Sequence, residues 1–192
     1  MIVHWQRVGF VHGVMNTDNM SIHGITIDYG PYGWLEDYNP NWTPNTTDNE
    51  HKRYRFGNQP QVAQWNLLQL ANALFPLIQE VKPLEKILNA FPIKYEEDYI
   101  QMIHNKLGLK ISNEATKNII YLLTKNLQLS ETDMTIFFRN LSQVSKEDSI
   151  ENIKLPGFLQ MFSDNVVSTS VLMFIFFGII MLVLGEDFMR SL

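Results

Sequence analysis

A helical pattern that runs from Pro60 to about Leu141 places the strongest constraint on how this chain folds. Its first part has apolar residues at helical spacing after Pro60, which stands where a first-turn proline is tolerated. The members of this stripe are Val62, Trp65, Leu68, Ala71, Leu74 and Phe75. The spacing predicts a helix that buries the stripe and is stopped or kinked at Pro76.

Further helices are predicted along the same stretch. One short helix is expected between Pro83 and Pro92, and a second is expected to end at Gly108. A third is marked by the apolar run at residues 119–123. A capping box, Ser130 to Asp133, precedes the last helix. Their expected positions are residues 84–90, 95–108, 119–123 and 134–141. The fold class is therefore expected to be mainly α, with an all-helical bundle in the middle of the chain.

The first part of the chain, residues 2–56, has a different character. Gly, Asn, Asp, Pro and aromatic residues dominate it, and only residues 2–9 show apolar residues at helical spacing. The alternation of Ile25, Thr26 and Ile27 predicts a half-buried strand with Asp28 at its end. We therefore expect loops that carry polar motifs, together with a short β segment.

Composition excludes several kinds of site. The chain has no cysteine, which rules out a disulfide framework, a zinc finger and a cysteine nucleophile. Its 15 Lys and Arg are scattered and are outnumbered by 20 Asp and Glu, for a net charge of −5. Because phosphate contacts need clustered basic residues, nucleic acid is not expected as a partner.

An uncharged, mostly apolar segment occupies residues 165–185. At 1.5 Å per residue a helix of this length spans roughly 31 Å, which matches the hydrocarbon core of a bilayer. The segment therefore predicts a transmembrane helix. The alternative is a helix that protein covers on all sides.

Residues 11–33 carry the candidate chemistry. Protein-kinase catalytic loops read His-x-Asp-x-x-x-x-Asn before a strand and Asp-Phe-Gly, because Mg²⁺ on nucleotide phosphates needs hard oxygen ligands from two nearby segments. His12 and Asn19 have the kinase spacing, and Asp28-Tyr-Gly30 imitates the metal-binding tripeptide. Val14 stands at the position of the catalytic aspartate, and a carboxylate appears instead at Asp18.

Two interpretations of these residues are open. Asp18, Asn19 and Asp28 offer two carboxylates and an amide oxygen, which suit a site for Mg²⁺ and a nucleotide. Clusters of Asn, Asp and Gly also build ordinary turns, and the loop would then be scaffold alone. In both interpretations His12 is expected to order the loop backbone rather than to act as an acid or base.

Several segments resemble the selenoprotein O family, also called YdiU. They are His12 to Ile22, Thr26 to Gly33, Tyr54 to Pro60 with Trp65-Asn66, and Asp133 to Leu141, which is similar to the helical region of that family. The resemblance covers roughly residues 2 to 142. It implies that residues 1–162 are a partial C-lobe of a protein-kinase-like (pseudokinase) fold, with the catalytic loop at 11–33 and the helical region at 60–142.

The resemblance also implies a function. The family is a protein adenylyltransferase, which transfers AMP rather than phosphate from Mg-ATP to Ser, Thr or Tyr hydroxyls of protein substrates. By motif position, Asp18 matches the proton acceptor, Asn19 and Asp28 match the ligands of Mg²⁺ or Mn²⁺, and Asp28 also lies against the nucleotide. A cytoplasmic location is implied in the same way.

The chain departs from the family pattern at both ends. The N-terminal lobe of the family, with its phosphate-contacting lysine and arginines, is missing from this sequence, and the apolar tail at 163–192 resembles nothing in the family. We therefore expect a fragment or a truncated or frameshifted gene that is inactive or impaired, in which the tail is a frameshift product or a transmembrane helix. The alternative function is a non-catalytic helical interaction module, which the tail could attach to a membrane.

Overall fold

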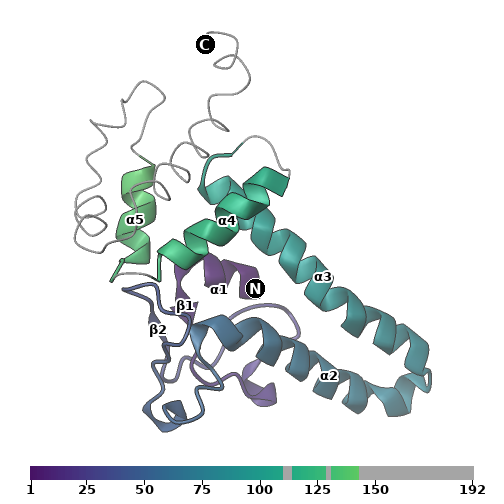
Figure 1. Ribbon diagram of the computed structural model, residues 1–192. Helices are drawn as coiled ribbons and strands as arrows, with labels where there is room; N and C mark the ends of the chain where they lie inside the picture. Colours follow the sequence, from purple (N-terminus) through teal and green to yellow (C-terminus); the bar gives the residue numbers. More distant parts are fainter. Residues whose placement is uncertain (110–113, 129–130, 143–192) are drawn as a thin grey trace. The chain divides into compact units, whose positions relative to one another are not determined.

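The structure is a computed structural model that describes residues 1–109, 114–128 and 131–142 (Figure 1). The described residues are mainly helical, as the sequence predicts, and they form two compact units. The first unit contains Met1–Leu35 and Asn39–Tyr99, and the second contains Glu36–Tyr38 and the described residues from Ile100 onward. Helix α3, Val81–Lys106, contributes to both units.

Two short paired strands enclose the predicted catalytic region of the first unit. Helix α1, Ile2–Val8, ends at Gly9, whose φ of 71° is the left-handed conformation common at helix ends. Strand β1, Phe10–Val11, follows at once and pairs antiparallel with β2, Gly33–Trp34. The loops between the two strands are therefore fixed at both ends.

Three 3₁₀ helices lie in the loops of the first unit. They are η1 at Thr17–Asn19, η2 at Thr46–Asp48 and η3 at Phe56–Asn58. The first contains two of the three predicted site residues, Asp18 and Asn19.

The strand predicted at residues 25–27 does not form, and this part of the prediction is wrong. Two side chains hydrogen-bond the segment, one at a side-chain oxygen and one at a backbone oxygen. The Trp5 indole Nε1 donates to Thr26 Oγ1 at 2.9 Å, and the His12 Nε2 lies 2.8 Å from the Ile27 carbonyl oxygen. The β segment near the metal-binding motif is instead the pairing of β1 with β2.

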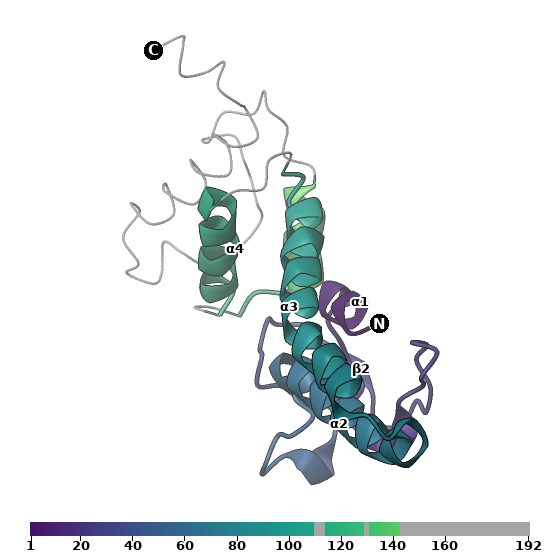
Figure 2. The same cartoon turned by 90° about the vertical axis from the view of Figure 1, so that its right-hand side faces the viewer.

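Two helices of the first unit are longer than predicted. Helix α2, Gln59–Ile78, includes Pro60 in its first turn, as expected, but continues through Pro76. Gln79 follows with a φ of 57° and joins α2 to α3 (Figures 1 and 2). The separate helices predicted at 84–90 and 95–108 are both part of α3, which runs through Pro92. Each proline removes one backbone hydrogen bond, and the hydrogen bonds of the flanking turns keep the chain helical on both sides of it.

The predicted apolar face of α2 is only partly buried. Val62 and Ala71 are buried, whereas Trp65, Leu68, Leu74 and Phe75 are 37–44% exposed. The core of the first unit explains the difference, because it includes only the early α2 residues Val62 and Ala63. Its other buried members are Ile2, Trp5, Phe10 and Met15, and Met1, Met20, Tyr54, Phe91 and Tyr95 pack against them.

The second unit holds the helices of the later part of the chain. Helix α4, Glu114–Asn126, and helix α5, Met134–Leu141, confirm the helices predicted around 119–123 and at 134–141. The predicted capping box is wrong in its register, since Asp133 is itself the N-cap of α5 and its carboxylate accepts from the Ile136 amide at 2.7 Å. The box placed Asp133 inside the helix and Ser130 at the cap, and Ser130 lies outside the described residues.

None of the helices within the described ranges is both long and apolar enough to cross a membrane. The predicted transmembrane segment, residues 165–185, lies outside the described residues, and so does the whole tail at 163–192.

A buried glutamine joins α2 to β1. Gln59 is fully buried, its Oε1 accepts from the His12 amide at 3.0 Å, and its Nε2 donates to the Phe10 carbonyl at 2.9 Å. Because β1 is only two residues long, this side chain supplies hydrogen bonds that a further strand would otherwise provide.

Replacing Gln59 should therefore destabilise the first unit. In Gln59→Leu the amide of His12 and the carbonyl of Phe10 lose their buried partner, and we expect the free energy of unfolding to fall by about 2–4 kcal/mol. Gln61→Leu is the matched control, since Gln61 is exposed on the same helix. Urea unfolding followed by circular dichroism measures both variants. Equal stability of the two would contradict the structural role of Gln59.

The aromatic side chains of α3 predict a pH effect. Phe91, Tyr95 and Tyr99 stack in sequence along the helix, and burial, with a smaller effect of Tyr99, raises the pKa of Tyr95. In the unfolded chain Tyr95 ionises near its ordinary pKa of about 10, whereas the folded chain keeps it neutral to higher pH. Its contribution to stability is thus complete below pH 10 and is lost as the pH rises further. We expect the thermal midpoint to fall less between pH 9 and 11 in Tyr95→Phe than in Tyr121→Phe, which alters an exposed tyrosine.

Candidate active site

The backbone of residues 10–16 is held by side chains from distant parts of the first unit. Gln59 accepts from the His12 amide and donates to the Phe10 carbonyl, as described above. The buried Asn45 donates from Nδ2 to the Gly13 carbonyl at 3.0 Å, and Asn66 donates from Nδ2 to the Met15 carbonyl at 2.9 Å. Three amide side chains thus satisfy backbone groups of this loop, as the hydrogen bonds between paired strands satisfy those of a strand.

His12 orders the backbone, as the sequence predicts. It is 1% exposed, and its Nδ1 accepts from the Val14 amide at 3.4 Å. An accepting Nδ1 leaves the proton on Nε2, which then donates to the Ile27 carbonyl at 2.8 Å. The imidazole is therefore occupied on both nitrogens by backbone atoms, and it links the loop at 12–19 to the residue just before Asp28.

A glycine brings the same two segments together a second time. Gly13 has a φ of +80°, and a Cβ at this position would lie 2.3 Å from the Pro31 carbonyl oxygen. Only glycine permits both the left-handed backbone and this close approach. With the His12 contact, it fixes the loop before Asp18 against the residues on both sides of Asp28-Tyr-Gly30.

Asp18 and Asn19 lie on η1 with different surroundings. Asp18 is exposed, and no described residue forms an ion pair with its carboxylate. Asn19 is half-buried and donates from Nδ2 to the Val14 carbonyl at 3.0 Å. This bond fixes the amide group, so its Oδ1 is available as an oxygen ligand.

Asp28 has an unusual backbone conformation. Its φ is 55°, in the left-handed region that aspartate enters more readily than most residues. The turn that follows is closed by the Gly30 amide, which donates to the Asp28 carbonyl at 2.8 Å. The side chain is exposed and stands directly after the segment that His12 fixes, so its carboxylate is open to a ligand.

The donor types of Asn19 and Asp28 suit a magnesium ion. Both present hard oxygen atoms, and Mg²⁺ is commonly held by one or two protein oxygens together with phosphate oxygens and water. Among residues 1–109, 114–128 and 131–142 there is no group of three His, Asp or Glu residues placed to hold a metal by themselves. A metal here would therefore take the rest of its coordination from nucleotide oxygens and water.

Sequence reasoning did not find the residues that hold the loop. Asn45, Gln59 and Asn66 lie 32 to 51 residues from the backbone groups that they bond. No local pattern marks such contacts. The one available signal is that Gln59 and Asn66 lie at buried positions of a helix where apolar residues are normally expected.

Comparison with known proteins identifies the family of the chain. Residues 1–169 match the model of the family described as protein adenylyltransferase SelO. This match extends beyond residues 2 to 142, over which the motifs carry the resemblance.

Relatives named protein nucleotidyltransferase YdiU are similar over most of the chain. That of Flavobacterium johnsoniae is 70% identical over 151 residues, which are 79% of this chain and 29% of the relative. That of Rhodopirellula baltica is 57% identical over 75% of this chain and 27% of its own length. That of Aromatoleum aromaticum is 53% identical over 77% of this chain and 28% of its own length. The chain thus spans less than a third of the length of these relatives. By the family match and by these identities, the chain belongs to the protein adenylyltransferase SelO family.

Proposed function

We propose that this chain carries the metal-binding and proton-accepting residues of a protein adenylyltransferase. The reaction is transfer of AMP from ATP to Ser, Thr or Tyr hydroxyls of protein substrates. The observation that supports it is the pair of contacts made by His12 and Gly13, which join the loop carrying Asp18 and Asn19 to the segment carrying Asp28. A nucleotide site needs oxygen ligands from two adjacent segments, and these contacts hold two such segments together.

Asp18 is the residue we propose as proton acceptor. In the reaction the hydroxyl oxygen of the substrate forms a bond to the α-phosphorus of ATP. The bond from that phosphorus to the oxygen bridging to the β-phosphorus breaks, and pyrophosphate leaves. The hydroxyl proton passes to the Asp18 carboxylate, which is exposed on η1.

Asn19 and Asp28 are the residues we propose as ligands of Mg²⁺ or Mn²⁺. A metal bound there supplies positive charge that offsets the charge on the phosphates. The hydrogen bond from Asn19 to the Val14 carbonyl orients the amide before ligand arrives, and the left-handed backbone fixes the start of the Asp28 side chain. These two features support the assignment, because they order both residues without a metal.

The cytoplasmic location implied by the family resemblance stays part of this proposal. The alternative function, a non-catalytic helical interaction module, gains nothing from the comparisons, because the similar relatives are named nucleotidyltransferases. We expect slow transfer by the 192-residue chain alone, because the parts of the relatives that it does not span would add binding energy that aligns the triphosphate.

Labelled ATP tests the reaction. With Mg²⁺ and a generic protein substrate, we expect slow incorporation of label from the α-phosphate and none from the γ-phosphate. Asp28→Ala should lower α-label incorporation about 100-fold or more, because a ligand to the developing charge is lost. Asp37→Ala is the matched control, since Asp37 is also exposed and should leave transfer unchanged. Transfer of γ-label would contradict the chemistry, and full activity of Asp28→Ala would contradict the site.

Calorimetric titration tests the metal ligands separately. With a non-hydrolysable ATP analogue present, Mn²⁺ should bind the unmodified chain, and binding should be much weaker without the analogue. We expect the double variant Asn19→Ala, Asp28→Ala to lose about tenfold or more in Mn²⁺ affinity. A double variant with changes at the exposed Asn41 and Asp37 serves as control. Unchanged Mn²⁺ affinity in the first double variant would show that these residues are not the ligands.

A further inference from the structure

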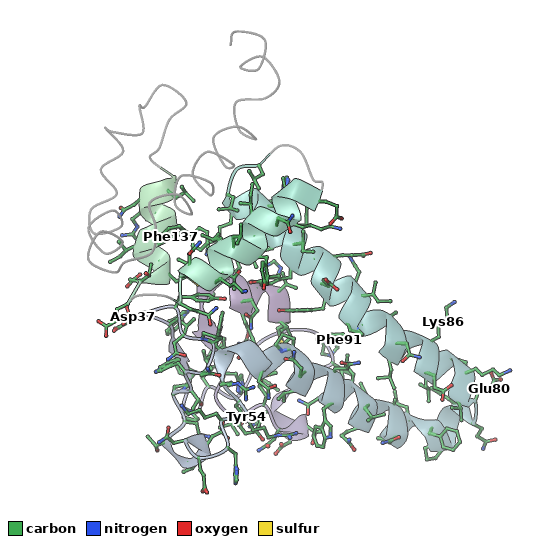
Figure 3. All side chains as sticks on the ribbon, in the orientation of Figure 1. Asp37, Tyr54, Glu80, Lys86, Phe91 and Phe137 are labelled. Carbon is green, nitrogen blue, oxygen red and sulfur yellow. The ribbon has the colours of Figure 1, made fainter. Side chains whose placement is uncertain are left out.

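Tyr54 reaches the predicted catalytic loop from a segment to which the sequence assigns no role (labelled in Figure 3). Its hydroxyl donates to the Asn16 Oδ1, across 38 positions of sequence. Asn16 is the residue that precedes η1, and its carbonyl accepts from the Asn19 amide at 3.0 Å to close the turn. Tyr54 therefore bonds the residue that closes the turn containing Asp18 and Asn19.

The Asn16 side chain makes this bond in place of a capping bond. Asn is a frequent N-cap residue, but the Asn16 side chain accepts no hydrogen bond from the amides of η1. Its oxygen is engaged by Tyr54 instead. A single 3₁₀ turn has weak hydrogen bonds of its own, so an external anchor contributes a large share of its order.

A buried carboxylate holds Tyr54 in place. Asp48 is 9% exposed, and its two oxygens accept from the Arg53 amide at 2.8 Å and the Tyr54 amide at 2.7 Å. Lys52, with a φ of 50°, donates its amide to the Asp48 carbonyl at 2.7 Å and turns the chain between them. The backbone of Tyr54 is thus fixed before its side chain reaches Asn16.

The ring of Tyr54 is fixed as well. It packs against the core of the first unit, and the Arg53 guanidinium lies 5.8 Å from its centroid and 4.7 Å from that of Trp65. A rigid aromatic side chain with both ends anchored can hold a loop residue with little loss of rotamer freedom.

We infer that Tyr54 is a positioning residue, which holds η1 through Asn16 so that Asp18 and Asn19 keep the orientation that the reaction requires. The inference rests on the proposed roles of those two residues. Asp48 sets the position of Tyr54, Tyr54 sets that of Asn16, and Asn16 closes the turn.

Backbone amide exchange measured by NMR on the 192-residue chain without ATP tests the contact. Tyr54→Phe removes the hydroxyl and keeps the ring, and exchange of the Asn19 amide should become about three- to tenfold faster, as for loss of one hydrogen bond. Amides of Ala63 and Asn66 in the first half of α2 should exchange as before. Tyr121→Phe, which changes an exposed tyrosine of α4, should have no effect at Asn19.

A double-mutant cycle separates this contact from a general effect on folding. Asn16→Ala should speed Asn19 exchange as Tyr54→Phe does, and the double variant should be no faster than either single variant. Independent effects that multiply, unchanged exchange in Tyr54→Phe, or equal acceleration in α2 would each overturn the inference.

Kinetics supply a readout that a purely structural role would not move. In the AMP-transfer assay Tyr54→Phe should lower kcat about tenfold while KM for ATP stays within about twofold. Equal kcat in Tyr54→Phe and the unmodified chain would overturn the positioning role. Failure of the unmodified chain to transfer AMP would count against the proposed function alone, since amide exchange needs no nucleotide.

Discussion

The hydrogen bonds of Gln59 are the interaction on which the rest of the first unit depends. One fully buried amide accepts from His12 and donates to Phe10, and so joins the start of α2 to the strand that leads into the loop. Without this link the two-residue strand would be held only weakly. The loop that follows it would no longer be anchored at its first residue, His12. The contacts of Asn45, Asn66 and Tyr54 then fix the loop at successive residues.

This arrangement differs from that of a loop supported by regular structure. Backbone groups between residues 10 and 16 find side-chain partners in the loop before η2 and at two positions of α2. Each partner has its own place in the fold, so the loop is held by several independent contacts. Such a loop can be exposed at Asp18 and Asp28 and still keep a defined backbone, which is what a site for a charged ligand requires.

The sequence predicts the helices well where apolar spacing is regular, and poorly where contacts with distant residues determine the local conformation. Periodicity finds α1, α2, α4 and α5, because each has buried residues at helical spacing. Local rules fail at Pro92, which lies inside α3, and at residues 25–27, where the Ile27 carbonyl is bonded by the His12 side chain and no strand forms. Motif spacing selects Asp18, Asn19 and Asp28. It does not identify Gln59 or Tyr54, because their hydrogen-bond partners are more than 35 residues away in the sequence.

The hydrogen bond inside the loop explains why residue 19 carries an amide when a carboxylate would bring more charge to a metal. Asn19 donates to the Val14 carbonyl, and an aspartate at this position would place an anionic oxygen against that carbonyl and have no proton to offer. The repulsion would push the side chain outward and break its link to Val14. Position 19 thus favours an amide, and the negative charge of the proposed site would come from Asp18 and Asp28.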